Sequence, residues 1–225
     1  MNGLTRRDLG RQSVALLPSL AWAQAEDPPL VSSAAAFRNG GRRGFVLGGV
    51  ERDVLLIDAM SRLGANTARV FFPFRRCRDC DRFGRAAGDQ AALRGLLAQA
   101  AARGIRLVVV GSFDGIEAPA FWRSAALRDS VVENWEWFAA TFGDDPAIAG
   151  LDLMNEPNPP WPSGDIAQAQ ADWNPLAEQA IAAIRRRRPA MPIVFEPVAG
   201  GNVLGLLGMR PFADPEIVYS IHFYT

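Results

Sequence analysis

Two kinds of apolar segment alternate along this chain, and this alternation limits its possible folds more than any other feature. Short runs rich in β-branched and aromatic residues are typical of strands, and longer runs with apolar residues three and four apart are typical of helices. The pattern predicts strands at 42–50, 65–74, 105–113, 147–154, 191–198 and 216–224, and helices at 51–64, 89–104, 119–142 and 165–188. Asp89 is a plausible N-cap, and Pro175 is predicted to start a fresh helix.

The predicted strands are apolar on both faces, which is typical of parallel strands covered by helices. Two α/β architectures then remain, an open doubly wound sheet and a closed (β/α)8 barrel. No Gly-x-Gly-x-x-Gly turn follows the first strand, which disfavours a dinucleotide-binding sheet. Polar residues gather where strands end, as in barrel enzymes: Arg69, Asn155, Glu156 and His222. The sequence therefore favours a (β/α)8 TIM barrel.

The number of strands falls short of a full barrel. Six are predicted where eight are needed, and about 250 residues are typical of the fold, whereas 200 follow position 25. An open six-strand sheet would expose two long apolar edges, which soluble proteins avoid. We therefore expect an incomplete barrel over residues 26–225, with about six of eight strands and without its C-terminal strands.

Composition excludes several classes of partner. The 24 basic and 24 acidic residues give a net charge of zero, so no nucleic-acid footprint is expected. No run approaches the roughly 18 to 20 apolar residues of a membrane span, so no membrane anchor is expected. With one His and two Cys, the chain cannot supply a Cys/His zinc site of four ligands. Neither a metal nor a cofactor is expected.

The first 25 residues resemble a secretory signal. Arg6 and Arg7 precede a short apolar stretch, and the segment closes on the small-residue pattern Ala23-Gln24-Ala25. The paired arginines are typical of a twin-arginine signal, which implies the twin-arginine export machinery as a partner and a periplasmic or extracellular location. The alternative is an ordinary amphipathic N-terminal helix.

Cys77 and Cys80 are the only cysteines of the chain. A Cys-x-x-Cys pair can be a redox motif, half of a zinc site or a small loop disulfide. The pair lies in a polar, arginine-rich loop rather than at the start of a helix. In an oxidising compartment we therefore expect a local disulfide.

Three segments carry a family resemblance: "GANTARVFFPF" at 64–74, "GLDLMNEPNPP" at 150–160 and "VYSIHFYT" at 218–225. They resemble glycoside hydrolase family 5, the cellulase- and mannanase-like members of clan A of the retaining glycosidases. The resemblance extends in order over about residues 43 to 225. It implies a secreted enzyme that cleaves a β-linked glucan or mannan, with two carboxyl groups acting on the sugar.

The resemblance also implies residue roles. Glu156 would be the acid/base, and Asn155 would donate to the sugar 2-hydroxyl. Arg69 would hold the nucleophile ionised and oriented, and His222 and Tyr224 would hydrogen-bond to the sugar and the nucleophile. Each has a structural alternative: a glutamate can cap a strand end, an arginine can lie on the surface of a strand, and a lone histidine can be a core residue.

Asn155 and Glu156 are adjacent, so their side chains point to opposite faces of a regular strand. Both reach one site only if the strand bends or ends there, and Pro157 is consistent with such an end. The apolar strand that leads to Glu156 would also raise the pKa of its carboxyl group, so that a proton stays available near neutral pH. Trp161, in the following loop, is expected to stack on a sugar ring, although a Trp in a proline-rich loop can also pack inward.

The sequence departs from the family at two positions. Asp114 stands where these enzymes often place a histidine, and the nucleophilic Glu at the end of a seventh strand has no counterpart. Glu196 is the nearest spare carboxylate, but its position does not match. Two interpretations follow: a secreted retaining glycoside hydrolase whose 225-residue chain alone has little activity, or an inactive truncated barrel that binds carbohydrate weakly.

Overall fold

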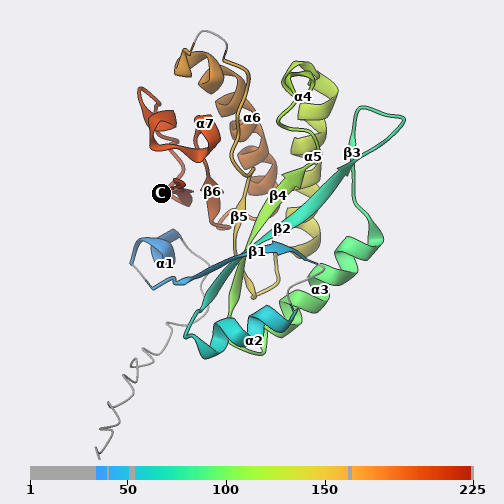
Figure 1. Ribbon diagram of the computed structural model, residues 1–225, viewed down its shortest axis with the longest axis vertical. Helices are drawn as coiled ribbons and strands as arrows, with labels where there is room; N and C mark the ends of the chain where they lie inside the picture. The colour runs from blue at the N-terminus through green and yellow to red at the C-terminus, as the bar shows by residue number, and fades with distance from the viewer. Residues whose placement is uncertain (1–33, 40, 51–53, 162–163, 224–225) are drawn as a thin grey trace, which may run out of the picture.

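The computed structural model describes residues 34–39, 41–50, 54–161 and 164–223; the expected leader at 1–25 lies outside them. A seven-stranded sheet forms the centre of the molecule (Figure 1). Its strands are β1 (Gly44–Gly49), β2 (Thr67–Arg76), β3 (Phe83–Gly84), β4 (Arg106–Phe113), β5 (Ile148–Asp152), β6 (Ile193–Phe195) and β7 (Ile217–Tyr219). All six predicted strands are present, and β3 is a short addition that pairs with the end of β2 in antiparallel orientation.

The strand order is β1-β2-β4-β5-β6-β7, and every neighbouring pair along it is parallel. The order follows the chain without reversing, whereas a doubly wound sheet reverses direction at a switch point. Because β-crossover-β units are right-handed, an order that advances in one direction places its helices on one face. The fold is therefore an incomplete barrel of the (β/α)8 type, as expected.

The helices surround the strands in Figure 1. They are α1 (Ala34–Arg38), α2 (Val54–Arg62), α3 (Ala87–Ala101), α4 (Pro119–Arg123), α5 (Ala125–Phe142), α6 (Ile166–Arg187) and α7 (Val198–Gly201), followed by the 3-10 turn η1 (Val203–Leu206). The single helix expected at 119–142 is two helices, because Ser124 is extended and its side chain accepts a hydrogen bond from the Leu127 N–H as the N-cap of α5. None of the helices in the described ranges has the length and apolar character of a membrane span.

Two local expectations about helix ends were wrong. Asp89 is not the N-cap of α3, which begins two residues earlier; instead its buried carboxylate receives two hydrogen bonds from the Arg75 guanidinium. Pro175 does not start a fresh helix, because α6 continues through it. Proline removes one backbone hydrogen bond, but the buried residues Trp173 and Leu176 on either side anchor this part of α6 in the core.

The two faces of β2 have different environments. Phe72 and Phe74 are fully buried and face the helices, where they lie edge-on to Phe138 and Trp135 of α5 with ring centroids 5.3 and 5.9 Å apart. The residues that alternate with the buried ones, Arg69, Phe71 and Pro73, are only partly buried and face the other side. The packing of Phe72 and Phe74 against the rings of α5 thus fixes the strand, and the opposite face of the strand directs Arg69 toward the barrel interior.

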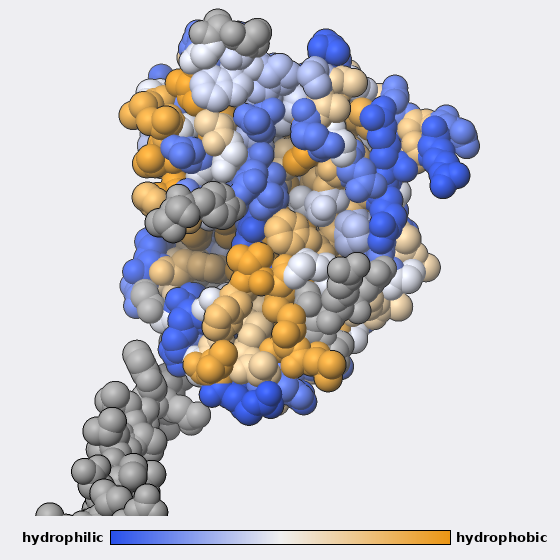
Figure 2. All heavy atoms as spheres, in the orientation of Figure 1, coloured by the Kyte–Doolittle hydropathy of each residue, from blue (hydrophilic) through white to orange (hydrophobic). Residues whose placement is uncertain are grey.

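A small second core covers part of the interior face of the strands. Val108 and Val194 are buried there, with Phe37 of α1 packed against them. The Ala34 N–H of α1 donates a 2.6 Å hydrogen bond to Glu216, just before β7. Figure 2 shows apolar side chains gathered around β1 and α2 on one face of the molecule. On β1, the side chain of Val46 is 63% exposed.

Candidate active site

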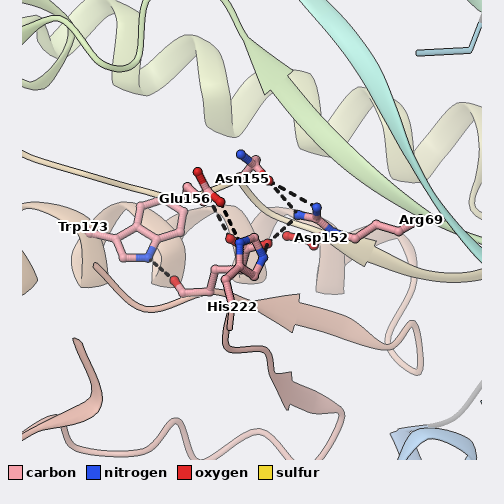
Figure 3. Close-up of polar contacts among 7 residues, drawn as sticks. Arg69, Asp152, Asn155, Glu156, Trp173 and His222 are labelled. Carbon is pink, nitrogen blue, oxygen red and sulfur yellow. Dashed lines mark hydrogen bonds and ion pairs between the residues drawn. The ribbon is translucent and has the colours of Figure 1, made fainter. Parts of the chain in front are cut away.

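Four of the five expected catalytic residues come together at the carboxyl ends of the strands (Figure 3). Arg69 reaches in from β2, Asn155 and Glu156 lie in the turn after β5, and His222 follows β7. Tyr224 lies outside the described residues. Asn155, Glu156 and His222 follow strand ends, as the barrel topology provides, whereas Arg69 is the third residue of β2 and reaches the site with its side chain.

The turn after β5 brings Asn155 and Glu156 to the same side. The strand ends at Asp152, and Glu156 adopts φ 50°, a left-handed conformation that is uncommon for a residue other than glycine. The Glu156 N–H donates a 2.7 Å hydrogen bond to Glu196 Oε2, which stabilises this backbone. Backbone of this kind occurs where surrounding contacts enforce it, often at functional sites.

Two buried tryptophans tie the helices to the strand ends that carry the site. Trp135 of α5 donates from Nε1 to the carbonyl of Leu153 at 3.0 Å, and Trp173 of α6 donates to the carbonyl of Glu196 at 2.8 Å. Both indoles are fully buried. Each bond satisfies a carbonyl just beyond the regular strand, so α5 and α6 hold the turns that present Glu156 and Glu196.

The Arg69 guanidinium lies at the centre of the cluster. Its Nε donates to Asp152 Oδ2 at 2.9 Å, Nη1 and Nη2 donate to Asn155 Oδ1 at 3.2 Å, and Nη2 forms an ion pair with Glu196 Oε1. An arginine carries only donors, so the oxygen of the Asn155 amide must face it. The Asn155 NH2 group is therefore turned away from Arg69, as a donor.

His222 bridges two carboxyl groups. Its Nδ1 lies 2.8 Å from Glu156 Oε1, and its Nε2 lies 3.0 Å from Glu196 Oε1. Its main-chain N–H donates to the Gly201 carbonyl at 2.9 Å. Gly201 has φ +74°, and a Cβ there would lie 3.2 Å from both His222 Cγ and Glu196 Oε2. Glycine at this position thus permits the close approach of the imidazole.

The three carboxyl groups of the cluster differ in exposure. The side chain of Glu156 is 36% exposed, whereas those of Asp152 and Glu196 are fully buried. Burial raises the pKa of Asp152 to about 8, the charge of Glu196 adds to this shift, and Arg69 opposes it. Burial also raises the pKa of Glu196, against the opposing effects of Arg69 and the Glu156 N–H.

Sequence reasoning did not place Asp152 in this site, and it left Glu196 without a role. One signal was available for each. Asp152 is the lone acidic residue in a strand that is otherwise apolar, and Glu196 directly follows another such strand. A carboxyl group at such a position needs a buried partner. The identity of that partner, Arg69 from a strand 83 residues earlier, requires the tertiary structure.

The remaining expected site residues, Trp161, Cys77 and Cys80, lie in segments between the helices and strands. Trp161 is half-buried and packs against the core. Cys77 and Cys80 are joined by a disulfide in the turn between β2 and β3, with Cα atoms 5.4 Å apart. Asp114 accepts a 3.1 Å hydrogen bond from the Arg76 N–H. Across the described ranges, no group of three or more His, Cys, Asp or Glu residues is placed to hold a metal ion.

A cavity of about 330 Å³ opens at the carboxyl ends of β1, β2 and β4. Its lining comprises Gly48, Gly49, Val50, Phe71, Pro73, Arg75 and Ser112. The Phe71 ring also lies under the Arg69 guanidinium, 5.1 Å from its central carbon to the ring centroid. Phe71 therefore connects this cavity with the carboxyl cluster.

A family model described as cellulase (glycosyl hydrolase family 5) matches residues 56–225. An endoglucanase of Paenibacillus polymyxa is 28% identical over 149 residues, which is 57% of this chain but 36% of the relative. A hyperthermophilic endo-beta-1,4-glucanase superposes with a TM-score of 0.70 at 16% identity, over 85% of this chain and 63% of its own. The catalytic domain of the major endoglucanase from Xanthomonas campestris pv. campestris gives 0.61 at 21% identity, over 81% and 63%. The chain thus spans about a third to two thirds of the length of these relatives.

Proposed function

The chain belongs to glycosyl hydrolase family 5, and from this premise we propose that it is a retaining glycoside hydrolase of a β-linked glucan or mannan, with Glu156 as acid/base. The observation that carries the proposal is the exposure of Glu156. It is the one carboxyl group of the cluster that is open to solvent, since Asp152 and Glu196 are fully buried. The endoglucanase names of the relatives favour a glucan.

The arrangement of the cluster suits the chemistry of glycosidic bond cleavage. Glu156 would protonate the leaving oxygen as positive charge develops on the sugar, and would later accept a proton from water. His222 Nδ1, 2.8 Å from Glu156 Oε1, would hold the carboxyl group in place. Asn155, with its NH2 group turned away from Arg69, would donate to a sugar hydroxyl beside the reacting carbon.

A retaining mechanism also needs an attacking carboxylate about 5 to 5.5 Å from the acid. Neither Asp152 nor Glu196 suits this role, because both are buried and held by Arg69. From the described residues we therefore expect the 225-residue chain alone to hydrolyse little. The same observation favours the second candidate, a weak carbohydrate-binding protein.

Hydrolysis of cellulose, soluble β-glucan, mannan and an aryl β-glucoside would test the proposal. The 225-residue chain would be compared with any longer chain that the reading frame encodes beyond Thr225. We expect Glu156→Gln to lower the rate at least 100-fold in whichever form is active, and Glu178→Gln, an exposed glutamate on α6, to leave it unchanged. A Glu156→Gln variant with the unaltered rate would contradict the acid/base role. Binding of cello-oligosaccharides without cleavage by either form would support the second candidate.

We also propose that residues 1–25 direct export by the twin-arginine route, on the sequence pattern that includes Arg6 and Arg7. Replacing both arginines with lysine should retain the chain in the cytoplasm of a bacterial host, as measured by fractionation. Unchanged export of this double variant would contradict the route.

A further inference from the structure

Only one of the two carboxyl oxygens of Asp152 accepts a hydrogen bond from the described residues. Its Oδ2 accepts a hydrogen bond from Arg69, whereas its Oδ1 is fully buried and no donor among the described residues reaches it. The residues paired with Asp152 on the adjacent strands are Val110 of β4 and Val194 of β6, which are apolar. An ionised carboxylate with one buried, unsatisfied oxygen is strongly disfavoured.

Glu196 has the opposite environment. Its Oε1 faces Arg69 Nη2 and His222 Nε2, and its Oε2 accepts from the Glu156 N–H at 2.7 Å. Three donors from three different elements surround this carboxyl group. Hydrogen bonds and positive charge of this kind stabilise the ionised form. Of two buried carboxyl groups that share one arginine, Glu196 is therefore the better carboxylate and Asp152 the better acid.

We propose that Asp152 is a neutral carboxylic acid in the folded protein, that its Oδ1–H donates to the Glu196 carboxylate, and that ionised Glu196 is the positioning residue for His222 and for the main chain at Glu156. The added proton satisfies the one buried oxygen that lacks a donor. It also leaves one positive and one negative charge in the buried group, on Arg69 and Glu196.

The electrostatics of the pair agree with this assignment. Burial and the neighbouring charge of Glu196 raise the pKa of Asp152 to about 8. A hydrogen bond between the two carboxyl groups raises the pKa of Asp152 and lowers that of Glu196, so the proton lies on Asp152. The charged or titratable groups that face this pair are Arg69 from β2, Glu156 from the turn after β5 and His222 from the segment after β7.

Ionised Glu196 also fixes the form of the imidazole. It requires a proton on His222 Nε2, which leaves Nδ1 as the nitrogen that shares a proton with Glu156 Oε1. Glu156 Oε1 is thereby held beside one defined nitrogen of the imidazole, in position to act on the leaving oxygen. This last consequence rests on the proposed function, whereas the protonation of Asp152 does not.

NMR of the 225-residue chain tests the inference without any hydrolysis. His222 is the only histidine, so ¹⁵N-labelled histidine gives one set of ring-nitrogen signals. With ¹³C-labelled aspartate carboxyl groups, the Asp152 signal is the one lost in Asp152→Asn. We expect this carboxyl group to be protonated at pH 6 and to titrate near pH 8, and we expect His222 Nε2 to carry a proton.

Three variants separate positioning from general stability. Asp152→Asn should leave the His222 signals in place, because its NH2 group can donate to Glu196 as the acid does. Glu196→Gln should shift both ring-nitrogen signals, because an amide cannot accept from all three donors. Asp89→Asn is the matched control: it removes a buried carboxylate paired with Arg75 and should leave His222 unchanged.

An Asp152 carboxyl group that is already ionised at pH 6 would overturn the inference. A shift of the His222 signals in Asp152→Asn as large as that in Glu196→Gln would do the same. If Glu196→Gln does not fold, the titration of Asp152 and the Asp152→Asn spectrum still test whether Asp152 is a neutral acid. A protonated Asp152, together with no cleavage or binding of glucan or mannan by either the 225-residue chain or a longer chain from the reading frame, would refute the proposed function and leave this inference standing.

Discussion

Arg69 connects more of the site than any other single residue. Its guanidinium binds Asp152 and Asn155 of one segment and Glu196 of another. The planar fork of an arginine can serve several acceptors at once, which an ammonium group does less well. The residue therefore acts both in the proposed chemistry and in joining β2 to the carboxyl ends of β5 and β6.

Arg69→Met should lower the free energy of unfolding by about 3–5 kcal/mol at pH 8, because it leaves buried carboxyl groups without their cation. The loss should be smaller at pH 5, where these groups take up protons. Urea unfolding at both pH values measures the difference. Arg69→Lys keeps the charge but lacks the planar guanidinium, so its free energy of unfolding should lie between those of the unaltered protein and Arg69→Met. An equal loss at pH 5 and pH 8 would contradict the electrostatic explanation.

Asp152→Asn should change how stability depends on pH. The pKa of Asp152 is raised from 3.8 to about 8, so between these values the folded state binds more protons than the unfolded state. The contribution of this group is therefore fully present below about pH 4 and is lost as the pH rises through about 8, by up to about 1.4 kcal/mol per unit. Asparagine cannot ionise, so the free energy of unfolding of the variant should rise relative to that of the unaltered protein as the pH increases over this range. Parallel curves of unfolding free energy from pH 5 to pH 8 would refute this.

At the scale of elements, close packing between β4 and α5 supports the site. Gly111 of β4 lies where a Cβ would be 2.7 Å from the Phe113 ring and 2.7 Å from the Trp135 ring. The same Trp135 donates to the Leu153 carbonyl at the end of β5. A glycine in the strand thus lets α5 approach closely enough to hold the turn that follows β5.

Gly111→Ala should lower the free energy of unfolding by about 1–3 kcal/mol, because two buried rings must move. Gly95→Ala supplies the control: this glycine lies inside α3, is exposed and has open space around its Cα. Alanine there should stabilise the protein by about 0.5–1 kcal/mol through helix propensity. Thermal or urea unfolding of both variants measures these opposite changes in stability. A Gly111→Ala protein as stable as Gly95→Ala would contradict the packing argument.

At the scale of the whole molecule, the sheet formed by the described residues ends at two strands, β1 and β7. Large apolar side chains are exposed at both: Phe45 and Val46 on β1, and Tyr219, Ile221 and Phe223 on or after β7. Exposed apolar strand edges promote pairing with other chains.

We therefore expect the 225-residue chain to self-associate as its concentration rises, measured by sedimentation velocity. Val46→Lys places a charge on the exposed edge and should weaken this association. Arg62→Lys, a charge-conserving change near the end of α2, is the control. A concentration-independent monomer would show that the edges do not mediate contact.

The sequence by itself determined the α/β class, the six main strands and the meeting of Arg69, Asn155, Glu156 and His222. These depend on local periodicity, on the rule that parallel strands end at one edge, and on short motifs. It did not determine where strands end: the segment expected at 216–224 forms a strand only at Ile217–Tyr219, because the chain then turns so that His222 bonds to Gly201.

Only the tertiary structure decided which carboxyl groups are buried and which one is open. Asp152, Glu156 and Glu196 are all acidic residues at or just after strand ends, and nothing local shows which of them is buried. Their difference arises because Arg69, His222 and two helical tryptophans, distant in sequence, enclose two of them and leave the third exposed. Protonation depends on burial and on nearby charge, and both are properties of the assembled fold.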